Sequence, residues 1–127
     1  MAIWHTRSRR KRTSGKFRRS SKRKKSQMGR EFTETSIGDH NVVRERVRGG
    51  NTKMRLKKDE YVNLNDSDSG ETSKEKIQDV LENDANPNLV RRDILTKGTI
   101  VNTEKGRAKI TSRLGQEGIL NAVVLEE

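Results

Sequence analysis

Cysteine is absent from this chain of 127 residues, and proline, tryptophan and tyrosine each occur only once. The lack of cysteine excludes disulfides, thiolate catalysis and cysteine-based zinc sites, and it favours a cytoplasmic protein. No apolar run exceeds four residues, whereas a transmembrane helix needs about 18 to 20 and a signal peptide needs an apolar stretch behind its cations. We therefore expect neither a signal peptide nor a membrane span.

Acidic residues are missing from the first thirty positions. This stretch contains thirteen Lys and Arg residues, while the other 97 residues contain 16 basic and 18 acidic ones. Cations without counter-charges repel one another, and little apolar surface is available here to offset the entropy lost on ordering. We expect two domains: residues 1–30 as a long, basic, extended N-terminal arm that is disordered in the free protein, and residues 31–127 as the folded body.

The composition of the arm indicates a nucleic acid as its partner. Eight of its thirteen cations are Arg, whose guanidinium forks match phosphate oxygens and stack on bases, so nucleic acid is favoured over a merely solvated tail. A membrane surface would require an amphipathic helix with an apolar face, which the arm lacks. The residues predicted to contact RNA here are Trp4, Arg7, Arg9, Arg10, Lys11, Arg12, Lys16, Arg18, Arg19, Lys22, Arg23, Lys24, Lys25 and Arg30. For Trp4 two interpretations stay open: it stacks on a base, or it packs against an apolar pocket of protein.

Residues 42–57 have the alternation of a β-hairpin around the turn sequence Gly49-Gly50-Asn51. Gly and Asn tolerate the positive φ that such turns require. In the second strand, Met54 and Leu56 are predicted to face inward. The exposed face would then carry Arg44, Arg46, Arg48, Lys53 and Arg55, a second predicted RNA-binding surface.

The rest of the body consists of short segments with turn signals between them. Strands are predicted at residues 60–64 and 94–103, and a hairpin at 99–111. A turn is expected at 114–118, followed by a buried central strand at 119–125. Pro87 predicts the first position of a helical turn. Residues 74–82 fit both periods and lean slightly to helix. Six to eight short strands with Gly-rich turns predict an all-β fold, with a small β-barrel body.

Catalytic chemistry has few candidates. The two histidines, His5 and His40, are expected to be ordinary surface residues, and no nucleotide-binding glycine loop is present. The polar loop after residue 65 lacks the spacing of a calcium loop. We therefore expect no enzymatic activity, no cofactor, no metal and no small-molecule substrate. The alternative function, from another class, is an architectural chromatin or DNA-binding protein, because Arg and Lys alone do not distinguish RNA from DNA.

Several motifs resemble a known family over the whole chain. They are Met1-Ala2-Ile3-Trp4, the Lys-Arg-Lys-Lys end of the arm, Met28-Gly29-Arg30-Glu31, Arg48-Gly49-Gly50-Asn51, Val80-Leu81-Glu82-Asn83, Arg91-Arg92, Thr96-Lys97-Gly98, Thr111-Ser112-Arg113 and Asn121-Ala122-Val123. In these motifs the chain closely resembles the archaeal form of the small-subunit ribosomal protein eight-e family. It departs from the family pattern at Leu114, where Pro is expected, and at Ser14-Gly15-Lys16, in place of a double Gly.

The resemblance implies a structural component of the archaeal-type small (30S) ribosomal subunit, located in the cytoplasm within the ribosome. Its implied partners are 16S ribosomal RNA and neighbouring small-subunit ribosomal proteins. The family also implies a β-barrel body with a basic arm threaded into RNA, and it favours a strand for residues 74–82. Five further RNA-binding residues come from its motifs: Asn51, Arg91, Arg92, Lys97 and Arg113.

Overall fold

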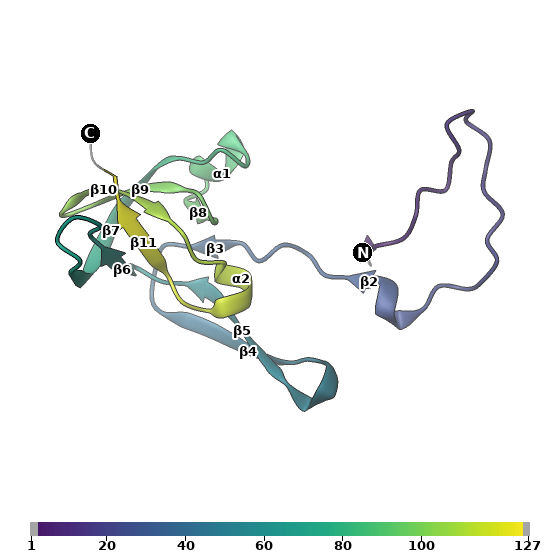
Figure 1. The fold of residues 1–127 in the computed structure, drawn as a ribbon, viewed down its shortest axis with the longest axis horizontal. Coiled ribbons are helices and arrows are strands. Elements are labelled where there is room, and N and C mark those ends of the chain that lie inside the picture. Colours follow the sequence, from purple (N-terminus) through teal and green to yellow (C-terminus); the bar gives the residue numbers. More distant parts are fainter. Residues whose placement is uncertain (1–2, 126–127) are drawn as a thin grey trace. The chain divides into compact units, whose positions relative to one another are not determined.

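The computed structural model describes residues 3–125 and divides the chain into two compact units, Met1–Phe32 and Thr33–Glu127 (Figure 1). We refer to them as the N-terminal unit and the barrel unit. Nearly all strands belong to the barrel unit. Within the described residues, no helix has the length and apolar character needed to cross a membrane.

A closed five-stranded barrel forms the centre of the barrel unit. Its strands are β6 (Tyr61–Asn65), β7 (Thr72–Glu82), β9 (Ile100–Thr103), β10 (Gly106–Ile110) and β11 (Asn121–Val124), in the order β10-β11-β6-β7-β9. All neighbours are antiparallel except β11 and β6, which run parallel. The predicted all-β fold with a small barrel is confirmed.

Alternation along the barrel strands fills its interior. Side chains two residues apart lie on the same face of a strand, so Val62 and Leu64 point inward from β6, and Ala108 and Ile110 from β10. Val101, Ile77 and Ala122 complete the barrel layer, and residues from outside it extend the core. The buried cluster consists of Leu56, Val62, Leu64, Ile77, Val80, Leu95, Val101, Ala108, Ile110, Leu114, Leu120 and Ala122.

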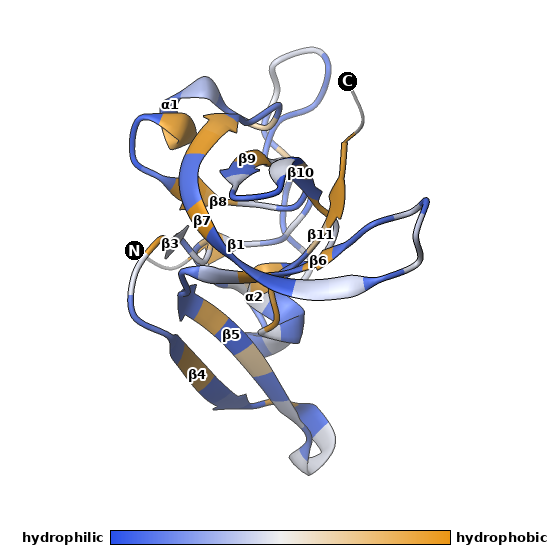
Figure 2. Ribbon diagram, turned by 90° about the vertical axis from the view of Figure 1, so that its left-hand side faces the viewer, coloured by the Kyte–Doolittle hydropathy of each residue, from blue (hydrophilic) through white to orange (hydrophobic). Residues whose placement is uncertain are grey.

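A second sheet, in the order β4-β5-β3-β8, lies beside the barrel. Its strands are β3 (Thr35–Ser36), β4 (Asn41–Arg46), β5 (Thr52–Lys58) and β8 (Ile94–Leu95). The β4–β5 hairpin projects from the barrel unit (Figure 2), and η2 (Arg48–Gly50) forms its tip, where Gly49 and Gly50 both have φ of 74°. The hydroxyl of Thr35, a buried residue, donates to the carbonyl of Leu56 at 2.7 Å and ties β3 to the inner end of the hairpin.

Strand β7 corrects the prediction of a helix for residues 74–82 and confirms the strand that the family resemblance implied. Two β-bulges interrupt its pairing with β9, one between Ile77 and Asp79 and one between Val80 and Glu82. A bulge inserts an extra residue and re-aims the side chains that follow it. Ile77 and Val80 are therefore both buried although they are three residues apart, a spacing that imitates a helical stripe.

Two single-turn helices connect the strands. In α1 (Pro87–Val90), Pro87 occupies the predicted first position, and the side chain of Asn86 accepts from the backbone N–H of Asn88 at 2.9 Å. The segment predicted as a simple turn at 114–118 contains α2 (Leu114–Glu117), which ends at Gly118 with φ of 70°. Leu114 is the first residue of α2 and is buried in the core, where it contributes to packing.

Gly118 is required by both its conformation and its surroundings. A Cβ at this position would lie 2.6 Å from the Cβ of Met54. Gly118→Ala is therefore expected to lower the free energy of unfolding by at least about 2 kcal/mol, from the left-handed backbone and the overpacking together. Gly50→Ala is the matched control, because its φ is 74° but no atom lies within 4 Å of the added Cβ, and a loss of about 1 kcal/mol is expected. Equal losses in urea unfolding would contradict the steric part of this argument.

The N-terminal unit is held by pairing of its two ends. Strand β1 (Ile3–Trp4) pairs with β2 (Met28–Gly29), directly after η1 (Lys25–Gln27). Between these ends, a bridge joins Arg10 to Lys16. The backbone thus doubles back into a loop, and the structure does not support the predicted long extended arm. Disorder of this segment in the free protein stays a prediction.

Candidate nucleic-acid interface

The cations of the N-terminal unit are exposed, and several contact its aromatic rings. The guanidinium of Arg7 lies 4.2 Å from the ring centroid of Phe17, and the ammonium of Lys11 lies 5.7 Å from it. Arg23 lies 5.1 Å from the ring centroid of Trp4. Such cation–π contacts orient the charged groups without neutralising them. Trp4 is half-buried within this unit, and the choice between its two interpretations stays open.

The loop encloses an open cavity of about 260 Å³. Its lining residues are Arg7, Arg9, Arg18, Arg19, Lys22 and Arg23, together with Thr6, Ser8, Phe17, Ser20, Ser21 and Gln27. No Asp or Glu occurs among the first thirty residues, so no carboxylate within the loop neutralises the six lining cations. A concave surface of this kind suits phosphate groups, which accept hydrogen bonds from guanidinium forks.

The register of the β4–β5 hairpin corrects the prediction of a single basic face. Directly opposed residues of an antiparallel pair share a face. Arg44 is opposite Met54, whereas Glu45 is opposite Lys53. Arg44 and Arg46 therefore lie on one face, and Lys53 and Arg55 lie on the other. Alternation in the sequence predicts which residues of one strand share a face. It does not predict which face of β4 lies on the same side as which face of β5, because that depends on the register.

Arg55 is engaged within the protein. Its Nε donates to Oε2 of Glu45 at 2.6 Å, and its Nη1 donates to the carbonyl of Gly115 at 3.1 Å. Both side chains of the ion pair are less than one third exposed. Arg55 was predicted to be exposed and Met54 to face the core, and both predictions are wrong. Arg55 is half-buried, and Met54 is 41% exposed.

Arg55→Ala is expected to lower the free energy of unfolding by about 1–2 kcal/mol, because two hydrogen bonds of a charged group are lost. Arg46→Ala, on the same hairpin but exposed, should change it by less than about 0.5 kcal/mol. Urea unfolding followed by circular dichroism measures both. Similar values for the two variants would show that Arg55 is not a structural residue.

The remaining predicted RNA-binding residues lie in three places in the barrel unit. Arg48 and Asn51 form the hairpin tip, where the Asn51 amide donates to the Arg48 carbonyl at 3.3 Å. Arg113 precedes α2, which packs beside β5. Arg91, Arg92 and Lys97 lie around α1 and β8, at the opposite end of the barrel unit from the hairpin tip (Figures 1 and 2). Arg92 forms a two-pronged ion pair with Glu34, at 2.6 and 3.1 Å. The structure therefore gathers only part of this set around the hairpin.

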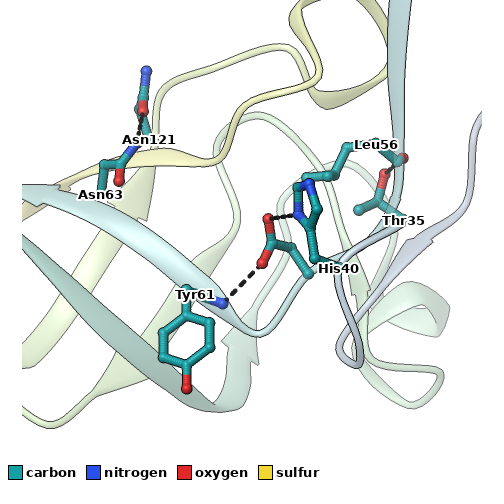
Figure 3. A network of polar contacts seen from close by, with 7 residues as sticks. Thr35, His40, Leu56, Tyr61, Asn63 and Asn121 are labelled. Atoms are coloured by element: carbon teal, nitrogen blue, oxygen red, sulfur yellow. Dashed lines mark hydrogen bonds and ion pairs between the residues drawn. The ribbon is translucent and has the colours of Figure 1, made fainter. Parts of the chain in front are cut away.

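A polar group on the barrel was missed by sequence reasoning. Asn63 donates from its amide to Oδ1 of Asn121 at 3.0 Å, across the parallel pair β6–β11 (Figure 3). Tyr61 lies two residues before Asn63, and its backbone N–H donates to Asp59, whose other oxygen is 2.8 Å from Nδ1 of His40. The sequence feature that could have indicated this group is Tyr61, an aromatic residue on the exposed face of the strand predicted at residues 60–64.

Several charged groups elsewhere on the barrel have shifted pKa values. Hydrogen bonding to Glu60, 2.9 Å away, raises the pKa of Lys76. The Lys105 ammonium, 3.1 Å from Glu75, lowers the pKa of that carboxyl. The Ser69 hydroxyl, which donates to Asp66 at 2.8 Å, likewise lowers the pKa of Asp66. Each shift favours the charged form that is already present at neutral pH. Among residues 3–125, no group of three or more His, Asp or Glu side chains could hold a metal ion.

The fold and the charge distribution together define a small β-barrel protein with a strongly cationic N-terminal unit, a class suited to polyanionic partners. The model of the family Ribosomal protein S8e matches residues 4–125, and the chain therefore belongs to this family. Similar proteins include one from Methanocorpusculum labreanum, 46% identical over 98% of this chain and 99% of its own length, and one from Methanococcus aeolicus, 45% identical over the full length of both. One from Nanoarchaeum equitans is 51% identical over 85% of each chain. All three are named small ribosomal subunit protein eS8.

Proposed function

We propose that this chain is a structural constituent of the small (30S) subunit of an archaeal-type ribosome, where it binds 16S ribosomal RNA beside neighbouring ribosomal proteins in the cytoplasm. The observation that carries the proposal is the family membership of the whole chain combined with thirteen cations and no acid in its first thirty residues. The protein acts by binding and not by catalysis.

Phosphate contacts supply the affinity in this proposal. The six cations that line the cavity of the N-terminal unit come from two segments of one loop, residues 7–9 and 18–23, so an RNA backbone entering the cavity meets guanidinium groups of both segments. When RNA binds, its phosphates form charge-assisted hydrogen bonds with these cations and reduce the repulsion between them. Such contacts position the protein and do not read base sequence.

The hairpin adds a second, smaller contact. Arg44, Arg46 and Arg48 are exposed, and none of them opposes an acidic residue in the register of the hairpin. Lys53 lies on the other face, next to Glu45. We therefore assign RNA contact on the hairpin first to the three arginines of β4 and the tip.

The experiment is co-sedimentation with crosslinking. A tagged full-length chain is expressed in an archaeal host, crosslinked to nucleic acid in the cells, and separated on a sucrose gradient. It is expected in the small-subunit fractions, with crosslinks that map to 16S ribosomal RNA. Recovery of mostly genomic DNA, outside ribosomal fractions, would overturn the proposal in favour of an architectural DNA-binding protein, an alternative that the family comparison does not favour.

A further inference from the structure

The outer face of strand β6 presents the only tyrosine of the chain to solvent. Tyr61 is 41% exposed, and its ring stands clear of the ribbon in Figure 3. The ammonium of Lys74 lies 4.7 Å from the ring centroid. Exposed cation–π pairs contribute only about 0.5–1 kcal/mol, and the ring is outside the buried core cluster. The cation–π contact therefore contributes little to the stability of the barrel, and part of the ring is available to a partner.

Neighbouring strands surround Tyr61 with polar and basic side chains on the same face. Lys76 is directly opposite Tyr61 on β7, and Lys74 and Asn121 flank Asn63 on its two sides. On β10, Lys109 is opposite Val123, one row further along. We call Tyr61, Asn63, Lys74, Lys76, Lys109 and Asn121 the β6 face. Glu60 is ion-paired with Lys76 and offsets its charge. Lys74 and Lys109 then give this face an excess of positive charge.

The Asn63–Asn121 pair leaves one amide acceptor and one amide donor available. Nδ2 of Asn63 and Oδ1 of Asn121 are used by their mutual hydrogen bond. Oδ1 of Asn63 and Nδ2 of Asn121 have no other partner among the described residues, and both side chains are exposed. An acceptor and a donor held by a fixed hydrogen bond match the polar edge of an unpaired base.

We propose that the β6 face binds a short unpaired segment of single-stranded RNA, with one base stacked on Tyr61. Lys74 contacts the adjoining phosphate, and the Asn63–Asn121 pair hydrogen-bonds the edge of the next base. Tyr61 and Asn63 are two residues apart on one strand, so their Cα atoms are separated by about 7 Å, which leaves room for a nucleotide at each. A base in an A-form duplex is stacked on its neighbours and is not free to lie on the ring. This inference rests on the proposed function and assigns RNA binding a third site, on the barrel.

The test uses the full-length chain labelled uniformly with ¹⁵N and with ¹³C in tyrosine, in which Tyr61 supplies the only tyrosine ring signals. A single-stranded oligouridine and an RNA duplex of the same length are titrated separately. Ring stacking is expected to move the Tyr61 signals upfield with oligouridine and to leave them nearly unchanged with the duplex. Tyr61→Ala is expected to weaken oligouridine binding at the β6 face, followed through the backbone amide signals of Asn63 and Asn121, by about 5- to 150-fold, the range for loss of one stacked base.

Two control variants separate stacking from other effects. Tyr61→Phe keeps the ring and should bind within about threefold of the wild type. Leu81→Ala removes a side chain of similar exposure, 42%, from β7, and it should not change binding. Unchanged Tyr61 signals, while amide signals of residues 7–30 shift, would overturn the inference and leave the proposed function standing. Absence of any RNA binding by the full-length chain would overturn both.

Discussion

Replacing the thirteen cations of residues 7–30 by glutamine is expected to abolish most of the salt dependence of RNA binding. Each phosphate neutralised by a cation releases counterions, so the logarithm of the binding constant falls linearly with the logarithm of salt concentration. If about half of the thirteen cations contact phosphates, the wild-type slope is on the order of −4 to −5 for a single-stranded type of site. Binding then weakens by about three orders of magnitude between 50 and 200 mM salt.

The measurement is the dissociation constant of a fluorescently labelled 16S ribosomal RNA fragment at four salt concentrations. The glutamine variant should have a slope that is flatter by several units and a much weaker affinity at low salt. The matched control changes the eight arginines of this segment to lysine, which keeps every charge. That control should keep the slope, while its affinity falls through loss of two-pronged hydrogen bonds. A glutamine variant with the wild-type slope would show that the barrel unit supplies the phosphate contacts.

The second large effect is expected in the core. Leu120→Ala should lower the free energy of unfolding by about 2–5 kcal/mol, because Leu120 is only 2% exposed and its truncation leaves a cavity among packed side chains. The corresponding fall in melting temperature is at least about 8 °C for a domain of this size. The loss is a large share of the 5–15 kcal/mol that stabilises a typical domain.

Ile119→Ala provides the comparison. Ile119 is adjacent in sequence but 52% exposed, and its truncation should change stability by less than about 0.5 kcal/mol. Far-UV circular dichroism in urea measures both variants, because the barrel unit contains nearly all of the strands. A loss for Ile119→Ala that equals the loss for Leu120→Ala would show that this segment packs differently from the structure.

Much of the barrel unit follows from local sequence pattern. The hairpins at residues 42–57 and 99–111 were predicted because alternation and turn chemistry act between residues close in sequence. The all-β class follows from the number of such segments, and the helical turn at Pro87 follows from the fixed φ of proline. The two bulges of β7 were outside the reach of this reasoning, since a bulge depends on pairing with β9 and leaves only a misleading three-residue spacing at Ile77 and Val80.

The candidate sites divide in the same way. The order of residues in the chain by itself determined that all of the excess positive charge lies in the first thirty residues. Charge is a property of residue type and does not depend on the fold. Tertiary structure decided which cations are available: register separates Arg44 and Arg46 from Lys53 and Arg55, and ion pairs occupy Arg55 and Arg92. It also brought together Asn63 and Asn121, 58 residues apart. Barrel closure creates such neighbours, because it depends on pairing between strands distant in the chain, which no local pattern encodes.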